Sequence, residues 1–357
     1  MKIRLVVSDF HIGKGKVLPD GSFNYLEDFF YDRQFVEFMQ YYRKGEFEKE
    51  NVELVCNGDF FNHLHLDADE QDPDLLSERV ALTRMEEIFK GHLEVFEEMK
   101  AFTQTPNHRV IFMLGNHDPG LLWPKVADFL KKKLASNVEV FLEPYVEGGV
   151  HIEHGHRFFA DSAYDQKRLF LKEGLSEPII NLPWGCLFVI HYLGFVKKER
   201  PYFDKVYPVA HYIRWALIHD TTFALRSIAN ILLYFIGFRF VKDPSRRSPF
   251  WQTMKLLKEM AVAPDLERQA KKILLTRRDC HVVVCGHTHD YLIRHYSADK
   301  TYINTGLWNE KVNLDPPFLG RTVRLTYALI EWDERGKPIP LLKEWRGTYH
   351  ITEDVYN

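Results

Sequence analysis

The chain has 357 residues, of which 45% are hydrophobic and 27% are charged, and this composition is typical of a globular protein rather than a disordered one. Its length suits one large domain or two ordinary ones. The net charge of −3 argues against a protein that coats nucleic acid over its whole surface, although the sum can hide a local basic patch.

Four short apolar and β-branched runs, each followed at once by polar residues, predict buried strands. They are residues 3–7, 52–56, 109–114 and 281–285. Stretches with helical spacing lie between the first three runs, from Asp32 to Arg43 and from Ser77 to Phe102. The N-terminal part therefore predicts strand–helix–strand units around a sheet.

Two later stretches alternate between apolar and polar residues in the manner of antiparallel strands. They are residues 137–159, with a turn signal at Gly148-Gly149, and residues 301–345, with a turn signal at Arg335-Gly336. Taken with the N-terminal units, they predict an α/β sandwich.

The stretch between these parts differs from both flanks. Its two most apolar runs, 186–196 and 228–238, are shorter than the roughly 18 to 20 residues that a membrane-spanning helix needs, so we expect neither to cross a membrane. Residues 191–280 carry seventeen Lys and Arg against eight Asp and Glu, a net charge of +9, which leaves −12 for the rest of the chain. The pattern predicts a basic, apolar, helical insertion. The predicted order is core, insertion and core, with boundaries at 1–165, 166–279 and 280–357.

The N-terminus and the cysteines indicate a cytoplasmic protein. The first apolar run is too short for the core of a signal peptide, and the cysteines lack the paired spacing of metal sites. A chain of this size does not need disulfides to stabilise its core, so we expect free thiols. The four cysteines are Cys56, Cys186, Cys280 and Cys285.

Five polar clusters carry residue types that bind metals. Four of them directly follow a predicted strand, where α/β sheets place their ligand sites, and their glycines let the chain turn sharply. Mixed carboxylate, imidazole and amide ligands suit manganese, iron or zinc better than calcium or magnesium. The clusters are Asp9-Phe-His11, Gly58-Asp59-Phe-Phe-Asn62, Gly115-Asn116-His117-Asp118, His154-Gly155-His156 and Gly286-His287-Thr288-His289.

Taken singly, most of these clusters have an ordinary structural explanation, since Asp-x-His and Gly-Asp are common in caps and turns. The pair His287 and His289 indicates a metal more strongly, because alternate residues of an extended segment point the same way. The ordered occurrence of five clusters after strands favours a metal site. Other histidines suit satisfied surface positions, namely His63, His65, His191, His211 and His219.

In this order the clusters resemble those of the calcineurin-like metallophosphoesterases, over about residues 1–165 and 280–345. The resemblance implies a four-layer α/β/β/α sandwich with a large helical insertion, and two divalent transition-metal ions, with manganese preferred and iron or zinc as alternatives. It implies an enzyme that hydrolyses phosphoester or pyrophosphate bonds through metal-activated water. The ligands that it implies are Asp9, His11 and His289 for one ion, Asn116, His154 and His287 for the other, and Asp59 as the bridge.

The same resemblance implies roles for the neighbouring polar residues. His117 would lie beside the substrate phosphate as general acid or transition-state donor, and Asp118 would orient its ring. Asn62 and His156 would support the metal ligands from behind.

A narrower resemblance is to the UDP-2,3-diacylglucosamine pyrophosphohydrolases. It rests on His154-Gly155 followed by Asp161 and Tyr164, on the helical insertion, and on Asn304-Thr-Gly-Leu-Trp308. It implies a lipid-linked nucleotide as the substrate. The sequence departs from that family in its larger insertion and at three positions, with His117 in place of arginine and His156 and Leu307 in place of aspartates.

The insertion has two interpretations. Apolar helices rich in Lys and Arg suit an acyl-binding lid or a contact with the inner face of an anionic membrane. Alternatively, the insertion is a helical subdomain that packs its own core. Its apolar aromatic residues exceed what a small cap needs, which favours a lipid-like substrate, and they include Trp184, Phe188, Tyr192, Phe195, Trp215, Phe235 and Phe238.

Three rival functions remain. A nuclease of the same fold would place the basic and aromatic residues beside the crevice for stacking on bases. A non-catalytic scaffold has no need of a complete set of metal ligands. A phosphoprotein phosphatase is disfavoured because Asp59 is followed by Phe-Phe-Asn-His rather than by the longer arginine-bearing motif of that family.

Overall fold

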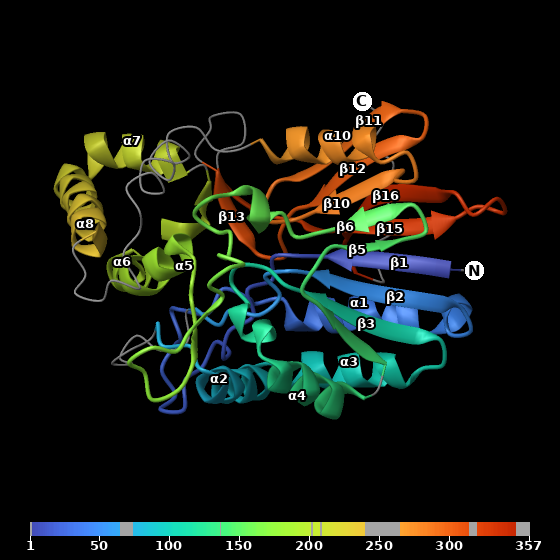
Figure 1. Cartoon of the computed structure of the whole chain (residues 1–357), viewed down its shortest axis with the longest axis horizontal. Coiled ribbons are helices and arrows are strands. Elements are labelled where there is room, and N and C mark those ends of the chain that lie inside the picture. The colour runs from blue at the N-terminus through green and yellow to red at the C-terminus, as the bar shows by residue number, and fades with distance from the viewer. Residues whose placement is uncertain are drawn as a thin grey trace.

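Two β-sheets lie face to face at the centre of the molecule, and helices cover the outer face of each sheet (Figure 1). This is the predicted four-layer α/β/β/α sandwich. The computed structural model describes residues 2–64, 74–135, 137–200, 203–207, 209–239, 265–313 and 320–347.

The six-stranded sheet contains the N-terminal strand-helix units. Its strands β1 to β4 run parallel, so their carboxyl ends meet at one edge, and β15 and β16 continue the sheet in antiparallel pairing. In spatial order the strands are β16 (Pro338–Trp345), β15 (Leu325–Trp332), β1 (Lys2–Val7), β2 (Asn51–Asn57), β3 (His108–Met113) and β4 (Val138–Phe141).

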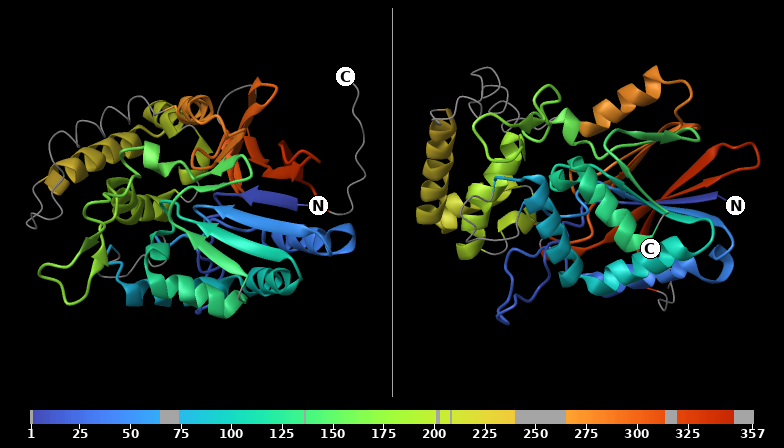
Figure 2. Two further views of the ribbon diagram at one scale, coloured as in Figure 1. Left: turned by 45° about the vertical axis from the view of Figure 1, so that its right-hand side comes forward. Right: turned by 60° about the horizontal axis from the view of Figure 1, so that its bottom comes forward.

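Four helices cover the outer face of this sheet and bury a large apolar cluster against it (Figure 2). They are α1 (Asp32–Arg43), α2 (Glu78–Gly91), α3 (Leu93–Gln104) and α4 (Pro124–Leu134). Ser77 caps α2 by accepting a hydrogen bond from the N–H of Val80. The single helix predicted from Ser77 to Phe102 is in fact two helices. It breaks at His92, which has a non-helical backbone (φ −129°, ψ 44°) and whose ring contacts Asp32 and Glu27.

The five-stranded sheet packs on the inner face of the first through a second apolar cluster. Its strands are β11 (Tyr291–Ser297), β12 (Lys300–Thr305), β10 (Val282–Cys285), β6 (Val150–Ile152) and β5 (Tyr145–Glu147). The hairpins β5–β6 and β15–β16 turn at the predicted positions. Three strands of the two sheets correct the antiparallel prediction, since β4 is parallel to β3, and β6 and β12 are both parallel to β10.

The helix α10 (Leu266–Thr276) falls within the residues assigned to the insertion, yet it packs on the five-stranded sheet and forms the fourth layer. Asp265 caps it by accepting a hydrogen bond from the N–H of Arg268. Among the described residues, the part of the insertion that stands apart from the sheets therefore ends with α8.

The insertion lies beyond the carboxyl ends of the parallel strands (Figure 1). Its helices are α5 (Trp184–Phe188), a π-helical turn (Val189–Leu193), α6 (Gly194–Glu199), α7 (Val209–His219) and α8 (Thr221–Arg239). Smaller strands join it to the core, namely β7 (Phe170–Leu171), β8 (Ile179–Ile180), β9 (Val206–Tyr207), β13 (Glu310–Asn313) and β14 (Gly320–Val323). Within the described part of the chain, no helix combines the length and the apolar character that crossing a bilayer requires.

Candidate metal centre

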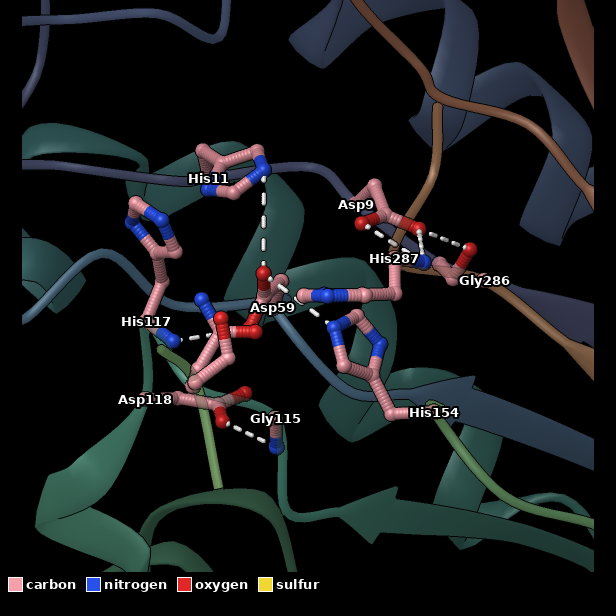
Figure 3. A network of polar contacts seen from close by, with 12 residues as sticks. Asp9, His11, Asp59, Gly115, His117, Asp118, His154, Gly286 and His287 are labelled. Atoms are coloured by element: carbon pink, nitrogen blue, oxygen red, sulfur yellow. Dashed lines mark hydrogen bonds and ion pairs between the residues drawn. The ribbon is translucent and has the colours of Figure 1, made fainter. Parts of the chain in front are cut away.

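Loops at the carboxyl ends of strands from both sheets bring six of the seven predicted ligands together. Figure 3 shows five of them, namely Asp9, His11, Asp59, His154 and His287. Among the described residues, three groups of side chains place their donor atoms within 4.8 Å of one another. The groups share members, so they form one continuous cluster. They are Asp9 with His11 and His289, His11 with Asp59 and His117, and Asp59 with His154 and His287.

Asp59 lies between the two halves of this cluster. Its Oδ2 is 3.2 Å from Nε2 of His154 on one side and 4.0 Å from Nε2 of His11 on the other. Its Oδ1 accepts the backbone N–H of His117 at 2.8 Å. A carboxylate in this position can contact ions held on both sides of it.

Asp9 occupies the other buried corner. Its Oδ1 lies 3.3 Å from Nε2 of His289, and its carboxylate accepts the backbone N–H of His287 and the hydroxyl of Ser8. Nε2 of His289 is in turn 3.2 Å from Nε2 of His11. The side chains of Asp9, His11 and His289 thus direct their donor atoms toward a common point.

The backbone of the cluster is strained. Left-handed φ angles cost about 1–3 kcal/mol each in residues other than glycine, and they persist where the surrounding structure fixes them. Two glycines relieve crowding, because a Cβ on Gly115 would meet the carboxylate of Asp59 and one on Gly286 would meet Ser8 and Asp9. The five predicted ligands with positive φ are Asp9 (57°), His11 (53°), Asp59 (51°), His287 (69°) and His289 (60°).

The charges of the cluster suit cations. Burial alone would raise the pKa of the Asp9 and Asp59 carboxyls, but His154 and the other nearby histidines lower both, and that of Asp59 lies well below its usual value. Burial would lower the pKa of His154, but Asp59 and then Asp9 raise it to about 10. Two buried carboxylates therefore attract positive charge at this point of the fold.

Two of the histidines around these carboxylates, His11 and His287, favour the neutral state that metal binding requires. Burial, followed by the charge of neighbouring histidines, lowers the pKa of His11 and of His287 to about 3. Nδ1 of His154 lies 2.9 Å from the carbonyl oxygen of Asn57 and donates its proton there. Nε2, which faces Asp59, is therefore the nitrogen that would bind an ion in exchange for its own proton.

Asn116 lies in the loop after β3, between Gly115 and His117. Its Oδ1 is buried and has no hydrogen-bond partner. A buried polar atom without a hydrogen bond is costly, and a cation bound at Oδ1 of Asn116 would remove that cost. The residues present therefore fit a divalent metal site.

Two side chains from the segment after His154 hold the loop of Asn116. The hydroxyl of Tyr164 donates to the carbonyl oxygen of Gly115 at 3.2 Å, and Sγ of Cys186 donates to that of Asn116 at 3.1 Å. The sequence indicated Cys186 only as a free thiol. All four cysteines are free, as predicted, and the structure shows that all four are buried.

The segment Asn304–Trp308 fixes the other two loops. The amide of Asn304 donates to the carbonyl oxygen of Gly286 at 2.8 Å, next to His287. Trp308 is fully buried and stacks on Phe10, with ring centroids 4.8 Å apart, and its backbone N–H donates to the carbonyl oxygen of Asp9. This segment is one of those on which the narrower resemblance rests, and its contacts show that it positions the loops that carry Asp9 and His287.

The role expected of Asp118 needs correction. Its carboxylate accepts the backbone N–H groups of Gly115, at 2.6 Å, and of Phe60, at 3.2 Å. Nδ1 of His117 is buried without a hydrogen-bond partner, so Asp118 does not orient the ring through that atom. Burial, with the charge of Asp59, raises the pKa of Asp118 to about 8. Asp118 instead positions the loops that follow β2 and β3.

Among the described residues, the remaining polar ones named in the sequence analysis lie outside the three groups of donor atoms. Asn62 accepts the backbone N–H of Leu64 within its own loop, and His156 packs beside His154 and Tyr164 but joins none of the three groups. His63 contradicts the expectation of a surface histidine, because it is fully buried and neither ring nitrogen has a partner. Of the other histidines, His191 and His219 are exposed as expected, and His65 and the side chain of His211 lie outside the described residues.

The aromatic residues of the insertion do not all have the predicted role. Trp184, Phe188 and Tyr192 stack in sequence, with centroid separations of 5.3 and 4.9 Å, and Tyr192 belongs to the insertion's own core. Trp215 instead is exposed on α7. This arrangement favours a self-packed subdomain over an acyl-lined lid. The other three predicted side chains, of Phe195, Phe235 and Phe238, lie outside those that the structure describes.

Comparison with known proteins identifies the family. The family model for calcineurin-like phosphoesterases matches residues 4–214, and no curated protein matches the sequence. Similar solved structures include vacuolar protein sorting 29 from Cryptosporidium parvum, which is 12% identical with a TM-score of 0.28 and covers 96% of this chain and 97% of its own. A conserved uncharacterized protein from Streptococcus pneumoniae TIGR4, described as a predicted phosphoesterase, is 10% identical, with a TM-score of 0.27 and coverage of 96% and 98%. Vps29 of Entamoeba histolytica complexed with Zn²⁺ is 11% identical, with a TM-score of 0.21 and coverage of 70% and 88%.

Identities and TM-scores at this level do not support a functional comparison, so the assignment depends on the family match, which extends over more than half of the chain. That match does not confirm the narrower resemblance to the UDP-2,3-diacylglucosamine enzymes. The family implies divalent metal ions, and the cluster around Asp59 has the donors to bind them. The chain belongs to the calcineurin-like phosphoesterase family and is a hydrolase that acts on phosphoester bonds.

Proposed function

We propose that the protein hydrolyses a phosphodiester or pyrophosphate bond with two divalent transition-metal ions held on either side of Asp59. The observation that carries this proposal is the position of the Asp59 carboxylate between His11 and His154. Manganese is the first ion to test, with iron and zinc as alternatives that suit the same mixed ligands. The proposed ligands are Asp9, His11 and His289 on one side, Asn116, His154 and His287 on the other, and Asp59 for both.

Metal ions in such a site supply a Lewis acid for the phosphoryl oxygens and bring the pKa of water near neutrality. The chain itself supplies position and hydrogen bonding. Asp9, Asp59 and His154 are buried, whereas His117, His287 and His289 are partly exposed, so a phosphate would reach the cluster along the three histidines.

His117 is the proposed donor to the leaving oxygen. Its ring lies 4.5 Å from that of His11 between centroids, and its backbone N–H is fixed on Asp59. Because the departing oxygen gains negative charge, a ring N–H at this place stabilises the transition state by a hydrogen bond or a proton.

For the substrate, we propose a lipid-linked nucleotide such as UDP-2,3-diacylglucosamine as the first compound to test. The basic, apolar insertion over the carboxyl ends of the strands and the order of the motifs support this choice, which would place the protein in the cytoplasm at the inner face of a membrane. The aromatic residues of the insertion stack on one another, and this argues against a binding mode in which acyl chains enter an internal cleft of the insertion.

Three substrates separate the alternatives. With manganese-loaded protein, turnover of UDP-2,3-diacylglucosamine well above that of bis-p-nitrophenyl phosphate would support the lipid-nucleotide proposal. Preference for single-stranded DNA would instead identify a nuclease. Lack of turnover on all three, with metal bound, would contradict the proposed activity.

A further inference from the structure

The outer face of the α7–α8 hairpin is apolar and exposed. The inner face is fixed, because Phe223 packs in the core of the insertion and Asp220 pairs with Arg200 at 2.7 Å. On the outer face, large apolar side chains are exposed that an isolated soluble helix pair would be expected to bury. Their exposed fractions are 45% for Trp215, 40% for Leu217, 74% for Ile218, 57% for Leu225 and 64% for Leu233.

These residues follow the helical repeat. Leu225, Ala229 and Leu233 are exposed at intervals of four residues and so form one stripe along α8. Trp215 and Ile218 lie one turn apart on α7, just before the turn into α8. The exposed apolar surface is therefore continuous in sequence and lies at the tip and outer side of the hairpin.

The charge of the hairpin has one sign. Between residues 209 and 239 the chain carries three arginines, and its one acid is the paired Asp220. Arg214 is exposed beside Trp215. Arg226 is paired with Glu199, and the side chain of Arg239 lies outside those that the structure describes. Arg214 is therefore the arginine that an anionic surface would meet, and the hairpin has no unpaired carboxylate.

We propose that the α7–α8 hairpin docks on a bilayer that contains anionic lipid. Tryptophan and arginine suit the boundary between headgroups and acyl chains, with Leu and Ile buried just below it. The helices lie on the surface, since neither is long and apolar enough to span a bilayer.

The hairpin stands at the outer end of the insertion, on the side of the molecule to which the carboxyl ends of the parallel strands point (Figures 1 and 2). Docking there brings the metal centre to the surface where amphiphilic phosphoesters reside. It also explains why the large apolar side chains of α7 and α8 are exposed on the surface of the hairpin. The inference is independent of the proposed hydrolysis, because lipid contact requires no catalytic residue.

Co-sedimentation of the full chain with phosphatidylcholine vesicles, with and without phosphatidylglycerol, tests the proposal. The wild type should bind the anionic vesicles more strongly than the neutral ones. Ile218→Gln with Leu225→Gln should lower the partition coefficient about tenfold or more, and Arg214→Gln about fivefold on anionic vesicles only. Leu275→Gln is the matched control, because Leu275 is 68% exposed on α10, away from the hairpin, and this change should leave binding unaltered.

Turnover of bis-p-nitrophenyl phosphate should be the same in all these variants, which separates loss of docking from loss of the metal centre. Absence of binding to anionic vesicles, or equal binding of the wild type and the double variant, would overturn the proposal. So would a dimer in light scattering that the double variant abolishes, because a second copy would then cover the hairpin.

Discussion

His92 should make the stability of the fold depend on pH between neutrality and about pH 9. Its ring is 3% exposed between α2 and α3, with Nδ1 2.5 Å from Oδ1 of Asp32 and Nε2 3.3 Å from Oε2 of Glu27. The first contact is a hydrogen bond, whereas Nε2 has the distance of an ion pair without the geometry of a hydrogen bond. Burial alone would lower the pKa of His92, but the two carboxylates raise it to about 9 from its usual 6.5.

A histidine whose pKa is higher in the folded chain than in the unfolded chain stabilises the fold fully below the unfolded value. That contribution is lost as the pH rises through the folded value. The shift from 6.5 to about 9 corresponds to about 3 kcal/mol, because one pKa unit is worth about 1.4 kcal/mol. The loss should affect the loop after His11, since Glu27 also accepts the backbone N–H groups of Gly13 and Gly15.

Urea unfolding of the wild type, His92→Gln and His295→Gln at about pH 6 and about pH 9.5 measures this effect. The wild type and the control His295→Gln, a change at an exposed histidine on β11, should each lose about 3 kcal/mol more than His92→Gln between the two pH values, because the other titrating groups contribute equally in all three proteins. His92→Gln should be less stable at the lower pH and change much less with pH. If His92→Gln followed the wild type in parallel, the assigned charge of His92 would be wrong.

Two further substitutions test the metal site and the contact between the insertion and the core. His117→Ala should retain metal while turnover falls about 10²–10⁴-fold, least for good leaving groups, and loss of metal would make His117 a ligand. Lys197→Met should destabilise the protein by about 3 kcal/mol, because Lys197 is fully buried, its Nζ lies 2.7 Å from Oδ1 of Asp28, and the change removes one charge of this ion pair. Adding Asp28→Leu should recover part of the loss in thermal unfolding, and an unchanged midpoint for Lys197→Met would contradict the assigned ion pair.

The strands and the ligand loops could be predicted because both are local in sequence. An apolar, β-branched run followed by Asp, Asn or His specifies a buried strand and the loop at its end, and each such loop lies in the cluster. The direction of the strands was harder to predict from the sequence. The alternation of residues 137–159 fits either orientation, and β4 proved parallel because it extends the sheet beside β3.

The misses have a common cause, which is contact between distant segments. The break at His92 depends on Glu27 and Asp32 rather than on its own helix, and the support of Asn116 by Cys186 joins residues 70 positions apart. Likewise, the amphipathic pattern of α10 is the same whether it packs on a sheet or in an insertion, so it could not be assigned to the fourth layer from sequence.

The metal content of the purified protein tests the central claim most directly. After incubation with manganese or zinc and removal of free ions, elemental analysis should find about two ions per wild-type chain, since the site has ligands on both sides of Asp59. Asn116→Ala should weaken the binding of one ion, and Asp59→Ala should weaken the binding of both. Circular dichroism should confirm that each variant is folded. A wild-type chain that binds no metal, or an Asp59→Ala variant that binds as much as the wild type, would contradict a dinuclear centre bridged by Asp59.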